Sequence, residues 1–174
     1  MRSFLFGPLV RIVPVGLVFL GIQRKIAAQY RPFYVVVDVM LSLVVAAGAG
    51  GGPERGALAG FVLGMMFDLA AGTPLGSSAL AFGLGGLVAG YVVTITPDPQ
   101  WWLAAAFAAL GAVVGEAAIP VIKLLIGQDG WITPRLAVIL PVQAVAAALL
   151  SPVLIPLARW MMAVKRKKWK AIPE

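Results

Sequence analysis

Apolar residues run through this chain in long stretches, separated by short breaks rich in glycine, proline or charge. A helix that crosses a bilayer needs about 20 mostly apolar residues. Open strands leave backbone groups unpaired in lipid, and a barrel requires an alternation that these runs lack. The pattern therefore predicts an all-α, polytopic membrane bundle of about six transmembrane helices. The expected spans cover residues 4–22, 33–50, 56–71, 75–95, 101–126 and 134–164.

Composition agrees with a protein that is surrounded by lipid. Of 174 residues, 61% are hydrophobic and only 12% are charged, whereas about a quarter of the residues in a soluble domain carry charge. One transmembrane domain over residues 1–164 and a basic tail over 165–174 account for the whole sequence. The chain has no cysteine and no histidine, which removes thiolate nucleophiles and the commonest general base and metal ligand. We expect no enzymatic activity, no metal and no cofactor.

Basic residues set the expected orientation, because lysine and arginine are enriched in cytoplasmic segments. The tail residues Lys165, Arg166, Lys167 and Lys168 predict a cytoplasmic C-terminus and serve as a topology anchor. They are also expected to attract anionic lipid, whereas nucleic-acid binding is not expected. Six spans then place Met1 inside as well. A five-span alternative puts the basic loop at 24–31 inside, but it requires one apolar run not to cross.

The third predicted span carries a stripe of glycines. Gly56, Gly60 and Gly64 recur at four-residue spacing and the next step is Asp68, so all four lie near one helix face that drifts by about 40° per step. The fourth span repeats the spacing at Gly86 and Gly90. Small residues let membrane helices approach closely. The stripe predicts tight packing, either within the bundle or against a partner helix.

Five charged residues lie within or near predicted spans: Arg11, Asp38, Asp68, Glu116 and Lys123. A charge at the centre of a membrane helix costs about 2.5–3.5 kcal/mol, so each requires an explanation. Asp68, near the end of its span, either reaches the headgroups or caps the following turn. Glu116 is the deepest, and Lys123 lies about 10 Å further along the helix axis. We expect Glu116 to pair elsewhere than with Lys123. Arg11 is a candidate partner for one of the three carboxylates, and such a pair is expected to be a structural polar clamp between helices rather than a proton relay.

The order of these features resembles the rod shape-determining protein MreD family. The resemblance is carried by Arg31-Pro32, Gly-Pro-Glu-Arg-Gly-Ala at 52–57, Gly-Phe-x-x-Gly at 60–64, Asp68, and Gly-x-Pro-Leu-Gly at 72–76 with its Pro74 and Gly76. It is best between Arg31 and Tyr91, while the last two spans match only in hydropathy. Many relatives have an aspartate directly after the proline at position 32. This chain has Phe33 there, and its nearest acid is Asp38.

The resemblance implies a non-enzymatic scaffold of the bacterial cell-elongation complex, in the inner membrane, that supports side-wall peptidoglycan synthesis. The implied partners are MreC, the glycosyltransferase RodA with its transpeptidase partner, and MreB. A scaffold of this kind is expected to present a glycine-lined or apolar exterior face to a partner helix. The family is also similar in fold to the substrate-binding subunits of energy-coupling-factor vitamin transporters. That similarity implies an alternative, a subunit that binds a small molecule or lipid in a polar cavity near Asp38, Asp68 or Glu116.

Overall fold

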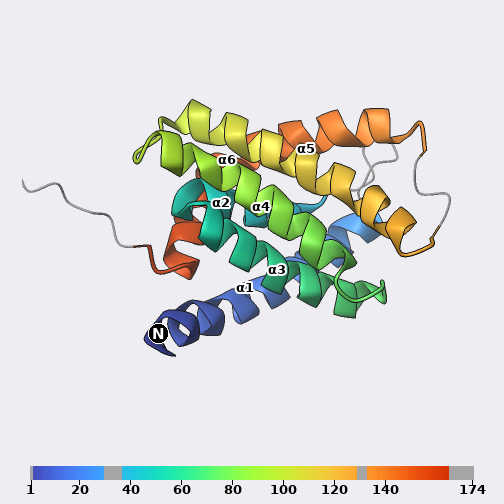
Figure 1. Ribbon diagram of the computed structural model, residues 1–174, viewed down its shortest axis with the longest axis horizontal. Helices are drawn as coiled ribbons and strands as arrows, with labels where there is room; N and C mark the ends of the chain where they lie inside the picture. The colour runs from blue at the N-terminus through green and yellow to red at the C-terminus, as the bar shows by residue number, and fades with distance from the viewer. Residues whose placement is uncertain (1, 30–36, 129–132, 165–174) are drawn as a thin grey trace, which may run out of the picture.

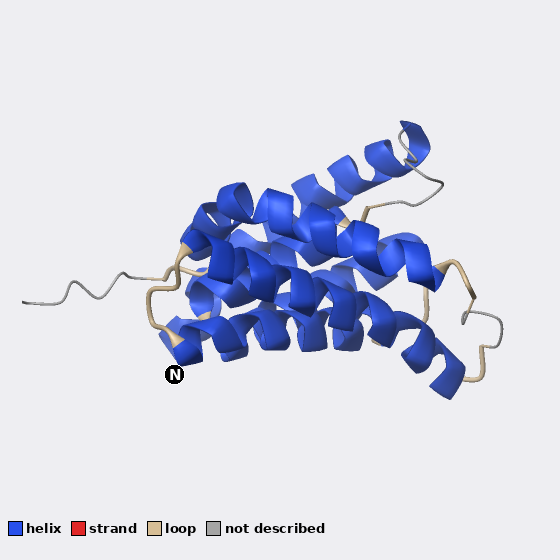
Figure 2. Ribbon diagram, turned by 90° about the horizontal axis from the view of Figure 1, so that it is seen from above, coloured by secondary structure: helices blue, strands red, loops and turns tan. Residues whose placement is uncertain are grey.

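The structure is a computed structural model that describes residues 2–29, 37–128 and 133–164, with side chains from Val10 to Lys25 and from Val37 onward within these ranges. The described residues form helices joined by short turns and contain no strand (Figures 1 and 2). The all-α prediction is therefore confirmed. The helices are α1 (Arg2–Gln29), α2 (Val39–Gly51), α3 (Pro53–Ala71), α4 (Ser77–Ile95), α5 (Trp101–Leu125) and α6 (Leu136–Met161).

The number of membrane spans is supported only in part. Three helices, α4, α5 and α6, are long and apolar enough to cross a membrane, which is consistent with a membrane protein. The second predicted span is wrong in length, because α2 has only 13 residues and so extends about 20 Å, less than the hydrocarbon thickness of about 30 Å. Residues 33–36 of that span, the predicted interface residue Trp131 and the basic tail at 165–174 lie outside the described residues.

Helix α2 forms the centre of the bundle. Every residue from Met40 to Gly50 is buried, and α2 packs against all five other helices. A helix that is apolar on all sides is stable only when other helices enclose it. In Figure 1 α2 lies among α3, α4 and α6, while α1 crosses the lower edge of the bundle. The shortness of α2 is therefore compatible with a membrane location, since its neighbours separate it from lipid.

The outside of the bundle is apolar. Every helix except α2 exposes large hydrophobic side chains, among them Leu17, Leu69, Ile95, Leu125 and Leu149. The buried positions, by contrast, include many alanines and glycines and several polar side chains. A soluble protein rarely exposes contiguous apolar surface on this scale. The distribution is the one expected of a protein whose solvent is lipid.

The glycine stripe of α3 packs against α4 inside the bundle. A Cβ atom added to Gly56 would overlap the carbonyl oxygen of Gly86, and one added to Gly60 would overlap that of Phe82. A Cβ on Gly64 would lie 2.5 Å from the Cα of Ala79. These pairs step in opposite directions along two antiparallel helices in contact over their length. Of the two alternatives, packing within the bundle or contact with a partner helix, the structure supports the first, because the backbone of α4 occupies this glycine face.

Residues at the two ends of the α3–α4 contact extend the same packing. A Cβ on Gly90 would overlap the Cα of Pro53, the first residue of α3. At the other end, Pro74 and Gly76 form the turn between the helices, where Gly76 adopts a φ of 97° that favours glycine. All the predicted packing residues of the third and fourth spans thus belong to one helical hairpin.

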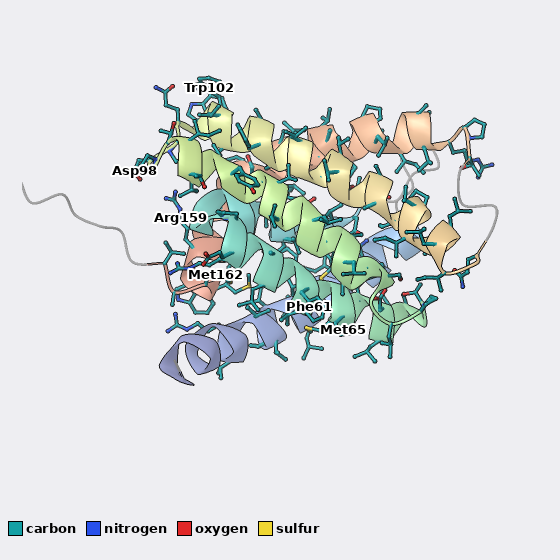
Figure 3. All side chains as sticks on the ribbon, in the orientation of Figure 1. Phe61, Met65, Asp98, Trp102, Arg159 and Met162 are labelled. Carbon is teal, nitrogen blue, oxygen red and sulfur yellow. The ribbon has the colours of Figure 1, made fainter. Side chains whose placement is uncertain are left out.

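The helices alternate in direction, so the bundle has two distinct ends. The "Asp38 end" contains the N-termini of α2, α4 and α6, and the "Trp160 end" contains their C-termini. Of the nine polar or charged residues that are buried in the described part of the chain, eight lie toward the Asp38 end and Ser151 is the ninth. Arg159, Met162, Asp98 and Trp102, labelled in Figure 3, all lie at the Trp160 end. Buried polar side chains are therefore concentrated at the Asp38 end of the bundle.

Candidate functional site: a polar centre at one end of the bundle

Asp68 caps the start of α4. Its Oδ2 accepts hydrogen bonds from the backbone N–H groups of Gly76 (2.9 Å) and Ser78 (3.1 Å). Its Oδ1 accepts from the hydroxyls of Thr73 (2.7 Å) and Ser77 (3.2 Å). The first N–H groups of a helix have no partner within the helix, and a carboxylate at this end also interacts favourably with the helix dipole. Of the two roles considered for Asp68, the geometry supports the cap.

The local sequence explains why Asp68 can reach α4. Gly72 ends α3 in a left-handed conformation with a φ of 68°, and its N–H donates to the Asp68 carbonyl. The chain therefore reverses within a few residues, and Gly76, also at positive φ, leads directly into α4. Non-glycine residues rarely adopt these angles. The spacing of Asp68, Gly72 and Gly76 thus encodes a hairpin turn closed by one carboxylate.

A second polar group surrounds the N-terminus of α2. Gln143 of α6 pairs with the backbone of Asp38: its Oε1 accepts from the Asp38 N–H and its Nε2 donates to the Asp38 carbonyl, both at 2.8 Å. The side chain of Asp38 in turn accepts from the N–H of Leu41 at 2.9 Å. Asp38 and Gln143 are both buried. Asp38 is thus an N-cap that is buried inside the bundle.

Gln23 of α1 completes this arrangement. Its Oε1 accepts from the N–H of Val39 at 2.7 Å, so α1 and α6 each supply an amide side chain to the start of α2. Ser42 donates its hydroxyl to the Asp38 carbonyl at 2.9 Å. Buried backbone groups need partners, and here distant helices provide them. Side chains from α1 and α6 therefore hold the N-terminus of α2 in its position within the bundle.

Glu116 of α5 lies beside this group. Its Oε2 atom is buried and has no hydrogen-bond partner among the described residues. Asp38 repels the carboxylate and Lys123 attracts it, and Lys123 also interacts electrostatically with Asp68. Lys123 is itself buried. The predicted partner of Glu116 outside the Lys123 pair is not found at Oε2 among the described residues. Lys123 nevertheless attracts the carboxylate electrostatically, although it lies two turns further along the helix.

Among the described residues, no carboxylate contacts Arg11, contrary to prediction. Its Nη1 donates to the backbone carbonyl of Trp160 at 3.2 Å, and its guanidinium lies 5.3 Å from the centre of the Trp160 ring. The last carbonyls of a helix lack partners within it, and cations near this end are favourable. Arg11 therefore caps the C-terminus of α6.

Two more arginines have the same role on other helices. Arg159 donates from Nε to the carbonyl of Gly50, at the end of α2, at 3.2 Å. Arg24 donates to the carbonyl of Ala70, at the end of α3. Neither was among the predicted site residues, because a cap between helices far apart in sequence leaves no local pattern.

The chemistry available at the Asp38 end is that of hydrogen bonding and charge. Within the described residues, no three acidic side chains are grouped closely enough to hold a metal ion. The structure brings Asp38, Glu116 and Lys123 together and connects Asp68 to them through Lys123. Gln23, Ser42 and Gln143 were missed by sequence reasoning. A lone glutamine in an otherwise apolar span was the available signal, because a buried amide requires partners.

Replacing Gln143 with leucine should destabilise the protein by about 2 kcal/mol, because the buried N–H of Asp38 loses its acceptor and leucine cannot replace it. The Asp38 carbonyl loses one donor but keeps the N–H and hydroxyl of Ser42. The thermal unfolding temperature in detergent measures this effect. The matched control is Gln128→Leu, since Gln128 is exposed at the end of α5. Equal unfolding temperatures for the two variants would show that the Gln143 pairing contributes nothing to stability.

No protein-family model, curated protein or solved structure matches this chain. The role of the polar residues at the Asp38 end is therefore inferred from their geometry.

Proposed function

We propose that this chain is a non-enzymatic membrane scaffold of the bacterial cell-elongation complex, of the MreD type, with all six helices in the inner membrane and its C-terminus in the cytoplasm. Its proposed partners are MreC, RodA with its transpeptidase partner, and MreB. The observation that carries the proposal is the continuity of the segment that resembles MreD. Residues 52–76 form α3 and the turn that leads into α4; Gly56, Gly60 and Gly64 contact α4, and Asp68 closes the turn.

The polar residues fit a scaffold because they act on the fold itself. Asp68 caps α4, while Gln23 and Gln143 hold the start of α2. These contacts fix helix positions and leave the apolar exterior as the surface available to partner helices. A membrane partner would bind there through van der Waals packing, since lipid provides no hydrophobic driving force between helices.

The proposal predicts that MreC crosslinks to one exterior face of the bundle. A photoreactive amino acid is placed singly at Leu17, Leu80, Leu110 and Leu149, which are exposed on four different helices. After illumination of membranes that contain MreC, we expect an adduct at one or two of these positions. Phe82, fully buried in α4, is the matched control and should give none. Absence of an adduct at all four positions, with the protein folded, would contradict the MreC-binding proposal.

A second candidate function is supported by Glu116. A buried carboxylate oxygen without a partner among the described residues is expensive, and a bound polar molecule would satisfy it. A subunit that binds a small molecule or lipid would account for this. Native mass spectrometry of the same membrane preparation distinguishes the two functions. A retained small molecule that is lost in Glu116→Gln but kept in the exposed control Glu54→Gln supports the second function, and a ligand-free mass contradicts it.

A further inference from the structure

Two arginines from different helices cap helix ends at the Trp160 end, and both caps involve the last turn of α6. Arg11 of α1 donates to the Trp160 carbonyl, and Arg159, the residue before Trp160, donates to the Gly50 carbonyl. Each cap uses one N–H group, whereas a guanidinium carries five. Neither arginine has any other hydrogen bond or ion pair within the described residues. The two caps therefore use only part of the N–H donors at the corner that Arg11, Trp160 and Arg159 form.

Exposed apolar side chains, here called the seam, continue from this corner along the outer surfaces of α1 and α6. On α1, Pro14 and Val18 lie one and two turns from Arg11 and are exposed. On α6, Pro156 and Val153 lie one and two turns from Trp160, are also exposed, and run in the same direction away from the end. The exposed Trp160 side chain lies at the junction, where tryptophan is typical of a membrane–water interface. Cationic donors thus sit directly above a surface suited to hydrocarbon.

We propose that the Arg11–Trp160–Arg159 corner binds the phosphate headgroup of an anionic phospholipid, whose acyl chains lie along the seam between α1 and α6. Guanidinium groups donate paired, charge-assisted hydrogen bonds to phosphate oxygens. The site differs from the basic tail at 165–174, which attracts lipid through charge alone. It requires that the protein lie in a membrane but not that it belong to the elongation complex, so either proposal can fail without the other.

Quenching of Trp160 fluorescence by brominated phospholipid tests the site. The full chain is purified with Trp101, Trp102, Trp131 and Trp169 replaced by phenylalanine, which leaves Trp160 as the only reporter. It is reconstituted in phosphatidylcholine vesicles that contain either brominated phosphatidylglycerol or brominated phosphatidylcholine. We expect the relative association constant to favour phosphatidylglycerol by about tenfold. Equal quenching by the two lipids overturns the proposal without the need for any arginine variant.

Variants then assign the preference to the arginines. Arg11→Gln and Arg159→Gln should each lower the preference about threefold, and the double variant should abolish it. Arg11→Lys keeps the charge and should retain most of it. Arg24→Gln is the matched control, because it removes a similar helix cap at the opposite end and should have no effect. A folded double variant, judged by circular dichroism, that keeps the full preference overturns the proposal.

Two further arms identify the source of the preference. A chain that ends at Val164 lacks the basic tail and should keep the preference, whereas its loss would assign lipid binding to the tail and overturn the site. Soluble glycerol phosphate at millimolar concentration should not displace the lipid. Complete displacement would identify a soluble phosphate ester as the ligand and overturn the assignment to a phospholipid.

Discussion

Gly56→Ala should leave little folded protein. The added Cβ would overlap the carbonyl oxygen of Gly86 and lie 2.6 Å from the Cα of Gly48, so α3 would have to move away from both α4 and α2. Overpacking a core typically costs about 1–3 kcal/mol and occasionally more. Here the obstacles are backbone atoms, which cannot rotate aside, and we expect a loss above about 3 kcal/mol out of a typical total of 5–15. Size-exclusion profiles and thermal unfolding in detergent measure the loss.

Gly83→Ala is the matched control for this variant. Gly83 lies on α4 only three residues from Gly86, but the nearest atom to an added Cβ is the Ala57 carbonyl oxygen at 3.6 Å. Alanine is the better helix former, so Gly83→Ala should raise stability by about 0.5–1 kcal/mol. The two substitutions, chemically identical, should therefore act in opposite directions. Similar changes in stability for Gly56→Ala and Gly83→Ala would show that the backbones of α3 and α4 are not in close contact at Gly56.

Asp68→Ala is expected to destabilise the fold by about 3–5 kcal/mol. The change removes the acceptor for the N–H groups of Gly76 and Ser78 and for the hydroxyls of Thr73 and Ser77. Each buried group left unsatisfied costs about 1–3 kcal/mol, reduced where water can enter at the end of the helix. Thermal unfolding of the purified protein reports the total, and the proportion of folded protein in membranes follows it.

A graded series separates the cap from general effects of charge. Asp68→Asn keeps one acceptor oxygen and should lose about half as much stability as Asp68→Ala. Asp98, exposed in the turn between α4 and α5, provides the control, and Asp98→Ala should change stability by less than about 0.5 kcal/mol. If Asp68→Ala behaved like Asp98→Ala, the hydrogen bonds to the α4 N-terminus would have no energetic role.

Features set by local sequence could be predicted. The helix bounds follow from apolar runs and glycine or proline breaks, and four of the six predicted spans agree with the helices to within three residues at both ends. Helix α1 ends seven residues later than predicted, and α2 begins six residues later. The glycine spacing predicted close packing correctly. It could not decide between an internal and an external face, because both use the same small residues. Only the position of α4 against Gly60 and Gly64 answers that question.

Contacts between distant segments could not be predicted. The Asp38–Gln143 pair spans 105 residues and the Arg11–Trp160 pair spans 149, and nothing in either local sequence identifies its partner. The shortness of α2 was partly visible, since an aspartate directly before an apolar run is a common N-cap. Hydropathy outweighed that signal, because the residues before Asp38 are also apolar. The hydropathy of the sequence therefore predicts which segments form helices better than it predicts the residue at which a helix inside the bundle begins.

The enclosure of α2 has a consequence for the order of synthesis. Its N-terminal backbone is paired by Gln143 and its C-terminal carbonyl at Gly50 by Arg159, and both residues come from α6, which follows the other five described helices in the chain. Until α6 emerges from the ribosome, the earlier helices surround a segment whose ends lack these partners. The bundle can therefore close only after α6 has been made, and a nascent protein interrupted before residue 143 leaves these backbone groups of α2 without their side-chain partners.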